Sequence, residues 1–369
     1  MFVAESYQPI FVIVMTLLTF IIGARYSTYN NNRFIAKGNE KIIPSLTLAF
    51  FVLLFIGLRP ISIVFCDMVG YAEAMTSHVF EDMPIRWDNN YFFTPLMALL
   101  SSNNASPQTP IIILAAINIV STFVAIRKMF PKDTLIALLV VFGSFIYFTT
   151  ATNGIKAGCA MGLLLCALAF RENLILSLSF LFLSMGFHHS MQMAVAAYVV
   201  CCFYKNSKTY FYVWIACLLL SLFHITYFQV LFGGMTDESG ALYLLNSMEE
   251  SGFGGRTGFR IDFVLYSSIP VVIGYYVIFK KKIASYSYRF LLNVYLLTNA
   301  VWMLCMYAPY TNRIAEIPWG ILPVVTIYPF LRENLGKGQY KSFQKLAYLL
   351  VGFSFFMHFV YYAFIYINR

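Results

Sequence analysis

Long apolar runs recur from one end of the chain to the other, separated by short polar segments that hold most of its charged residues. Each run approaches the roughly 20 residues that an α-helix needs to cross a bilayer. The runs are continuous, whereas a barrel strand alternates apolar and polar positions. The pattern predicts about twelve helices, at roughly 8–24, 42–58, 110–126, 134–150, 155–170, 174–187, 189–203, 210–227, 263–279, 290–308, 314–331 and 346–366.

Composition supports a membrane location. The chain is 60% hydrophobic and 11% charged, with a mean hydropathy of +0.72, whereas soluble domains carry roughly 25% charged residues. We therefore expect an all-α fold, a polytopic integral membrane helix bundle in which residues 1–369 form a single transmembrane domain. The first apolar run has no basic leader, so we expect it to remain in the membrane rather than to be a cleavable signal peptide.

The distribution of cations predicts an orientation. When the apolar runs are threaded through a bilayer, all but seven of the 25 Lys and Arg residues fall on one side, which the positive-inside rule assigns to the cytoplasm. Both termini then face outward. The net charge of +9 is mostly inner-face cations beside anionic lipid headgroups, so nucleic acid is not expected as a partner. The exceptions are Arg59, Arg86, Lys156, Arg256, Arg260, Arg313 and Arg369.

Two long polar segments lie on the expected outer side, at about 59–109 and 228–262. The first contains an apolar piece at 91–101 that is too short to span a bilayer, so we interpret it as a re-entrant or surface-lying helix. In the second, glycines near Arg256 allow positive φ and close approach of the backbone, as in a loop that closes over a ligand. Chemistry is therefore expected on the outer side.

Five outer cations form the main candidate site. They are Arg59, Lys156, Arg256, Arg260 and Arg313. They run against the charge bias of the chain, and arginine binds pyrophosphate oxygens bidentately while staying charged. The sequence thus predicts up to five cations around one outer cavity that takes an anionic ligand, such as a lipid-linked pyrophosphate. The structural alternatives are a snorkelling Arg59 and a salt-bridge network with Asp67, Asp262 and Glu316.

Asp67, Tyr71 and His188 are the remaining candidates. Asp67 and Tyr71 share the first outer loop, where a solvated carboxylate is the ordinary alternative to a functional one. His188 interrupts an apolar hairpin, and an imidazole in partial hydrocarbon is costly, which favours a functional site. The structural alternative is a hydrogen-bonded core histidine.

The seven cysteines are scattered, and none forms a C-x-x-C pair or a spacing with histidine that is typical of zinc sites. We expect neither disulfides nor a metal site, and no cofactor.

Several of these segments together resemble a known family. They are GLRP at 57–60 with Asp67 and Tyr71 downstream, the small-residue helix after Lys156, His188 with Ser190, GFRIDFVLYSSIP at 258–270, and NRIAEIPWGILPVVTIYP at 312–329. The chain resembles the EpsG-type branch of the Wzy polymerases of bacterial surface polysaccharide. The likeness covers nearly the whole chain and is best from Gly258 to Pro329. The chain departs from the family pattern at Cys66, where a glycine is usual before the aspartate, and at Lys156, where an arginine is usual.

The resemblance implies an inverting glycosyltransferase of the membrane-embedded GT-C type, working at the outer face of the bacterial inner membrane. The growing glycan would leave undecaprenyl pyrophosphate for a hydroxyl of the next lipid-linked repeat unit, without a nucleotide sugar or a metal. Arg59, Arg256, Arg260 and Arg313, assisted by Lys156, would hold the pyrophosphate, and Tyr71 would contact the substrate. His188 or Asp67 would be the general base. The implied partners are undecaprenyl-pyrophosphate-linked glycans, the lipid bilayer and a chain-length regulator.

Three other functions remain open at this point. A secondary transporter with twelve helices would carry charges at the midplane of the membrane, whereas here they lie towards the outer edge. An O-antigen ligase would share the donor but use lipid A core as its acceptor. A membrane O-acyltransferase would also use an embedded histidine, but it would need a route for a cytoplasmic acyl donor.

Overall fold

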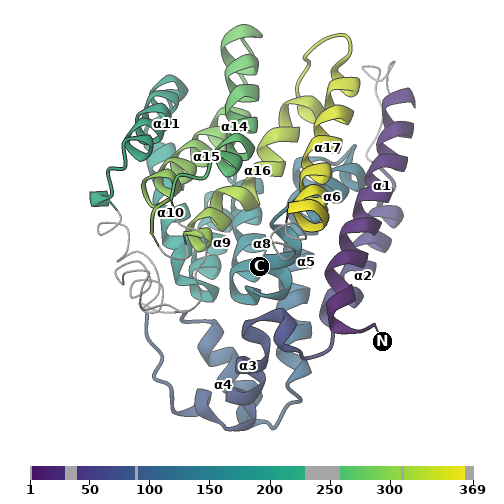
Figure 1. Cartoon of the computed structure of the whole chain (residues 1–369), viewed down its shortest axis with the longest axis vertical. Coiled ribbons are helices and arrows are strands. Elements are labelled where there is room, and N and C mark those ends of the chain that lie inside the picture. The colour runs from purple at the N-terminus through teal and green to yellow at the C-terminus, as the bar shows by residue number, and fades with distance from the viewer. Residues whose placement is uncertain (1, 30–39, 88–89, 229–257, 309–310, 362–369) are drawn as a thin grey trace. The chain divides into compact units, whose positions relative to one another are not determined.

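The computed structural model describes residues 2–29, 40–87, 90–228, 258–308 and 311–361 (Figure 1). Regular structure in these ranges consists of helices, which confirms the all-α prediction. Contacts divide the chain into two compact units, one made of Met1–Phe187 with Phe330–Arg369 and the other of His188–Pro329. They are called unit 1 and unit 2 below. The single transmembrane domain expected from the sequence stays a prediction.

Five described segments are long and apolar enough to cross a membrane by length and composition. These segments are Ala4–Tyr26, Gln108–Met129, Ile261–Lys280, Asn312–Arg332 and Gln339–Val360. Other predicted spans appear as shorter apolar helices, such as Ile155–Ala169 and Leu174–Phe187. The structure is consistent with a helical membrane bundle.

Unit 1 is built around two tightly packed helices, α5 and α8, at residues 108–129 and 155–169. Its helices are α1 (Tyr7–Tyr29), α2 (Ile42–Gly57), α3 (Asp67–Thr76), α4 (Phe93–Ser102), α5 (Gln108–Met129), α6 (Thr134–Phe142), α7 (Tyr147–Thr152), α8 (Ile155–Ala169), α9 (Leu174–Phe187) and α17 (Gln339–Phe356). A Cβ atom placed on Gly162 of α8 would lie 2.7 Å from the carbonyl oxygen of Asn118 on α5. Glycine is needed there because the two backbones approach so closely. The small-residue packing predicted after Lys156 is confirmed.

The first and last described α-helices pack together in unit 1. Helices α1 and α17 lie side by side (Figure 1), with the rings of Phe20 and Tyr348 stacked at a centroid distance of 4.1 Å. The Tyr348 hydroxyl also donates a hydrogen bond of 2.7 Å to the Phe20 carbonyl oxygen. The fold of unit 1 therefore depends on contacts between residues at opposite ends of the sequence.

One predicted span differs from the structure. The apolar run at 134–150 forms two short helices, α6 and α7, rather than one long helix. The break at 143–146 begins with Gly143 and Ser144, and the Ser144 hydroxyl donates a 2.7 Å hydrogen bond to the Val141 carbonyl oxygen. A Gly–Ser pair with such a side-chain bond is a common cause of a helix break. Hydropathy did not reveal it because both helices are apolar.

The first outer segment is mostly helical rather than irregular. It contains the 3-10 turns η2 (Ile63–Phe65) and η3 (Val79–Asp82) together with α3 and α4, which lie close together at one end of unit 1 (Figure 1). Helix α4 corresponds to the short helix predicted at 91–101.

Unit 2 has α15 at its centre. Its elements are the 3-10 turn η4 (His189–Met191), α10 (Gln192–Phe203), α11 (Ser207–Leu222), α14 (Ile261–Tyr275) with the π-turn η5 (Tyr276–Lys280), α15 (Tyr286–Leu304) and most of α16 (Asn312–Arg332). Trp214 of α11 donates a 2.8 Å hydrogen bond to the Asn299 side chain of α15. Tyr295 of α15 donates one of 2.6 Å to the carbonyl oxygen of Ser267 on α14. Buried polar contacts thus join the three helices, as is common between membrane helices.

Candidate functional site

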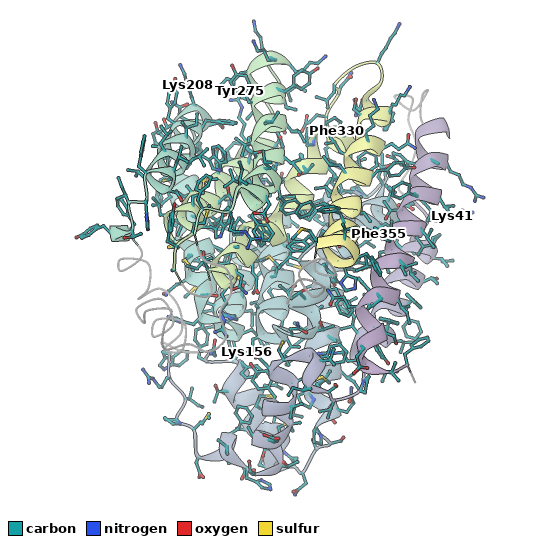
Figure 2. The ribbon with its side chains drawn as sticks, in the orientation of Figure 1. Lys41, Lys156, Lys208, Tyr275, Phe330 and Phe355 are labelled. Atoms are coloured by element: carbon teal, nitrogen blue, oxygen red, sulfur yellow. The ribbon has the colours of Figure 1, made fainter. Side chains whose placement is uncertain are left out.

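Unit 1 brings together two of the residues predicted from the sequence. The Lys156 ammonium lies 5.9 Å from the ring centroid of Tyr71 and 5.2 Å from that of Phe93. The two rings meet edge to face at a centroid distance of 5.3 Å. The two distances from the ammonium to the ring centroids are within the range of cation–π attraction. Lys156, Tyr71 and Phe93 are called the lysine–aromatic cluster below, and Lys156 is labelled in Figure 2.

Each member of the lysine–aromatic cluster comes from a different helix. Lys156 is in the first turn of α8, directly after the turn formed by Asn153 and Gly154, whereas Tyr71 is on α3 and Phe93 begins α4. Phe93 was not predicted from the sequence. The only signal was that three consecutive aromatic residues, Tyr91, Phe92 and Phe93, open the short helix expected at 91–101.

Asp67 occupies the first position of α3, four residues before Tyr71, so the two side chains lie on the same face of the helix. Asp67 is exposed. The residue before it, Cys66, has φ 46° and ψ −102°, a conformation that favours glycine. The family pattern, in which a glycine usually precedes this aspartate, therefore has a backbone reason.

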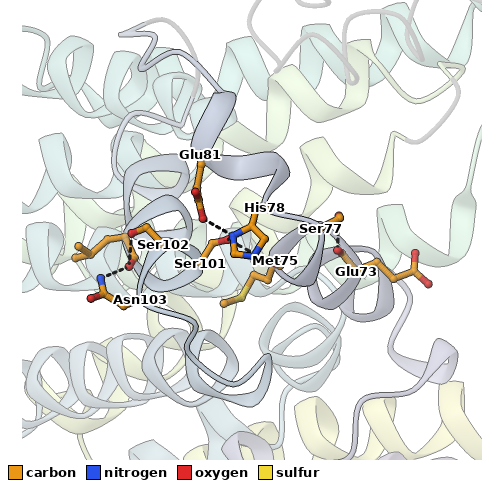
Figure 3. A network of polar contacts seen from close by, with 9 residues as sticks. Glu73, Met75, Ser77, His78, Glu81, Ser101, Ser102 and Asn103 are labelled. Atoms are coloured by element: carbon orange, nitrogen blue, oxygen red, sulfur yellow. Dashed lines mark hydrogen bonds and ion pairs between the residues drawn. The ribbon is translucent and has the colours of Figure 1, made fainter.

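A polar network holds the outer segment together (Figure 3). The Nδ1 of His78 lies 2.5 Å from Glu81, and the Ser101 hydroxyl of α4 donates a 3.0 Å hydrogen bond to the Met75 carbonyl oxygen of α3. The hydrogen bond from His78 lowers the pKa of the Glu81 carboxyl below its usual value. This network fixes α3 relative to α4, and hence Tyr71 relative to Phe93.

Arg59 is completely buried in unit 1. One terminal nitrogen donates a 2.6 Å hydrogen bond to the carbonyl oxygen of Ile56 in α2, and the other donates one of 2.8 Å to the carbonyl oxygen of Thr152 in α7. Its guanidinium also lies 5.3 Å from the ring of Phe65. Burial lowers the pKa of Arg59 to about 10, so the group stays charged at neutral pH. That Arg59 itself touches pyrophosphate stays a prediction.

In unit 2, Arg260 forms a bidentate ion pair with Asp262. Its Nε and a terminal nitrogen donate hydrogen bonds of 3.0 and 2.6 Å to the two carboxylate oxygens. The guanidinium also packs on the ring of Phe263 at 4.3 Å from the centroid. One pair of the salt-bridge network considered above is therefore present. The pair fixes the direction of the Arg260 side chain at the start of α14.

Aromatic residues of α14, α15 and α16 support the Arg260 position. Phe263 lies 4.7 Å from Trp319, whose indole nitrogen donates a 2.9 Å hydrogen bond to the Ser267 hydroxyl. Trp319 also packs against Trp302 at 5.4 Å. Arg313 lies in the first turn of α16, the helix that carries Trp319.

His188 caps a short helical turn at the beginning of unit 2. Its Nδ1 accepts a 3.2 Å hydrogen bond from the backbone nitrogen of Ser190 and lies 2.7 Å from the Ser190 hydroxyl. Because a backbone N–H can only donate, the neutral ring is assigned with its proton on Nε2. In this tautomer Nε2 carries the proton, and the basic nitrogen, Nδ1, faces Ser190.

The structure thus brings Lys156 together with Tyr71 and pairs Arg260 with Asp262. Arg256 lies outside the described residues. The expectation that all five cations surround one cavity concerns residues of both units, and it stays a prediction. Within the described ranges, no cluster of three or more His, Cys, Asp or Glu side chains could hold a metal ion.

Comparison with known proteins assigns the family. The model of the EpsG family matches residues 42–368. The chain belongs to the EpsG family. The matched range contains every candidate residue discussed above, including Lys156, Tyr71 and the Arg260–Asp262 pair.

Membership of the EpsG family makes the chain a membrane protein of the polysaccharide polymerase-like kind. No curated protein matches it. No solved structure matches it either. The family assignment and the contacts within each unit are therefore the observations on which a function can be built.

Proposed function

We propose that this EpsG family member polymerises undecaprenyl-pyrophosphate-linked oligosaccharide repeat units into O-antigen or a related surface polysaccharide. The observation that carries the proposal is the family match over residues 42–368. The apolar helices and the cationic side chains of both units support it, because a lipid-linked anionic substrate needs both kinds of surface. The proposed location is the bacterial inner membrane, with the reaction at its periplasmic face.

The proposed reaction is a metal-independent transfer with inversion at the anomeric carbon. A hydroxyl of the incoming repeat unit attacks the anomeric carbon of the growing glycan, and a new glycosidic C–O bond forms. The bond from that carbon to the pyrophosphate breaks, and its electron pair leaves with undecaprenyl pyrophosphate. The proton of the attacking hydroxyl passes to a general base.

The departing pyrophosphate needs stabilisation of its growing negative charge, which cationic donors supply in place of a metal. We assign this role to Lys156 in unit 1 and to Arg260 and Arg313 in unit 2, with Arg256 as a further candidate. Tyr71 is proposed to contact the glycan beside Lys156. The ion pair with Asp262 supports the role of Arg260 because a side chain held in one direction loses less entropy on binding.

The general base is assigned to Asp67 rather than to His188, although both were candidates from the sequence. The neutral His188 ring accepts at Nδ1 from Ser190, which leaves an N–H rather than a lone pair at Nε2. We therefore give His188 the role of a hydrogen-bond donor to a substrate oxygen. Asp67 is an exposed carboxylate on the same helix face as Tyr71, as a base beside the bound glycan would be.

The test is the gel profile of surface polysaccharide in cells that lack this gene, complemented with wild type, Lys156→Ala, Arg260→Ala or Arg313→Ala. Arg332→Ala is the matched control, because Arg313 and Arg332 lie near opposite ends of the same helix, α16. We expect deletion to collapse the ladder to single repeat units. The three variants should shorten it strongly, and Arg332→Ala should not.

Other outcomes would contradict the proposal. An unchanged ladder after deletion would exclude a polymerase. Loss of all surface glycan, with full-length polymer retained on its lipid carrier, would indicate a ligase, whereas a defect in flux of a solute would indicate a transporter. A normal ladder in well-expressed Arg260→Ala and Arg313→Ala cells would remove the pyrophosphate assignment.

A further inference from the structure

Arg59 is a buried cation whose terminal nitrogens donate hydrogen bonds to the protein backbone. Its two terminal nitrogens bond the carbonyl oxygens of Ile56 and Thr152, which lie in the last turns of α2 and α7. Carbonyls in the last turn of a helix lack partners within the helix and carry its negative dipole end. The Arg59 guanidinium therefore supplies hydrogen-bond donors and a positive charge to the ends of two helices.

The bond to Thr152 is close to the lysine–aromatic cluster in sequence. Thr152 is the last residue of α7, the chain turns at Asn153 and Gly154, and Lys156 follows in the first turn of α8. The position of the Thr152 carbonyl therefore sets where α8 begins and where the Lys156 side chain starts. Arg59, which follows α2 by two residues, fixes that carbonyl.

Arg59 also contacts the segment that carries the other candidates. Its guanidinium packs on Phe65, a buried residue two positions before Asp67 and six before Tyr71. The side chain of Gln108 fixes the backbone of Arg59, with hydrogen bonds of 2.7 and 3.1 Å to the carbonyl oxygens of Gly57 and Arg59. The Arg59 side chain thus connects the end of α2, the end of α7 and the segment before α3.

We propose that Arg59 is a positioning residue that acts through Lys156, by fixing the turn between α7 and α8 against the segment that leads into α3. In this role its guanidinium is held by the protein and need not contact the pyrophosphate. This inference rests on the proposed function for the role of Lys156 in polymerisation, but the geometric part stands apart from it. Arg59 has no exposed surface, in contrast to the partly exposed Lys156.

A double-mutant cycle tests this relationship. Arg59→Met removes the guanidinium while keeping much of the side-chain length, and we expect it to reduce polymerisation by about 10²-fold, as displacement of a binding group does. In a Lys156→Ala background, Arg59→Met should reduce polymerisation further by no more than about 2-fold, because there is then no Lys156 side chain for Arg59 to position. Full multiplication of the two effects would show that Arg59 acts independently, and would overturn the proposal.

A second measurement does not depend on activity. Lys156→Cys, made in a Cys66→Ser background because Cys66 is an exposed thiol, is labelled with a membrane-impermeant thiol reagent. We expect Arg59→Met to change the labelling rate by about 10-fold or more, since a shifted turn changes the exposure of the side chain. An unchanged rate would overturn the proposal even if polymerisation were lost. If deletion of the gene leaves the ladder intact while the labelling rate shifts, only the proposed function fails.

Arg59→Lys covers the case in which Arg59→Met does not accumulate in the membrane. Lysine keeps the charge but lacks the fork that reaches two carbonyl oxygens. We expect Arg59→Lys to show the same changes in labelling rate and non-additivity as Arg59→Met, to a smaller extent. Wild-type behaviour in both measurements would show that charge alone suffices, and the positioning role would be wrong.

Discussion

The imidazole Nδ1 of His188 lies 2.7 Å from the hydroxyl of Ser190 and 3.2 Å from its backbone nitrogen. The ring thereby caps the turn that begins at His189, with the acceptor role at Nδ1 and the proton at Nε2. A structural role at one nitrogen and a chemical role at the other can be separated by substitution, because asparagine places a polar atom near Nδ1 and glutamine places one near Nε2.

We predict that His188→Asn folds normally but loses about 10²-fold in polymerisation, the usual size of a general acid–base or donor contribution. His188→Gln should retain more activity, because its amide N–H can replace Nε2–H, but with a less stable turn. Polymer length in complemented cells, together with the amount of protein in the membrane, checks both. If His188→Asn were fully active, His188 would serve as a cap and not as a donor to substrate.

Replacement of Cys66 by glycine is predicted to stabilise unit 1. Cys66 has φ 46° and ψ −102°, a region that is strained for residues with a Cβ. Relief of such strain is worth about 1 kcal/mol or more. Thermal unfolding of the purified protein in detergent should therefore show a higher midpoint for Cys66→Gly. Cys66→Ala, which keeps the Cβ, should show no such gain, and equal midpoints for the two variants would contradict the prediction.

Two glycines in helices offer a matched comparison of packing. A Cβ on Gly162 would meet the Asn118 carbonyl oxygen at 2.7 Å, whereas nothing lies within 4 Å of one on Gly352. We expect Gly162→Ala to destabilise the protein by about 1–3 kcal/mol, since α5 and α8 must move apart. Gly352→Ala should be neutral or slightly stabilising, because alanine favours a helix more than glycine does. Unfolding midpoints of the two variants measure the difference.

The outer segment of unit 1 should loosen at acid pH. The hydrogen bond from His78 holds the pKa of Glu81 below its ordinary value in the folded chain. The carboxylate therefore contributes stability that is present above the ordinary pKa of Glu and is lost as pH falls through the lowered one, below about pH 4. Hydrogen–deuterium exchange across residues 73–103, corrected for intrinsic rates, should accelerate in that range. The acceleration should be absent in Glu81→Gln, which has no carboxyl to titrate.

The sequence determined the class of the protein and most of its helix positions. The run at 174–187 coincides with α9, and the run at 42–58 nearly coincides with α2, because the length and hydropathy of an apolar run are local properties of the chain. The same is true of the motifs around Gly258 and Arg313 that indicated the family, since such motifs are short stretches of consecutive residues.

Only the tertiary structure decided which candidate side chains have partners and of what kind. Hydropathy predicted that Arg59 ends a helix, but not that it reaches the carbonyl oxygen of Thr152 in another helix. It gave no reason to join Phe93 with Lys156 and Tyr71. The preference of a residue for lipid or water is a property of its own side chain, whereas a hydrogen bond or ring contact between distant residues depends on how whole helices pack against one another.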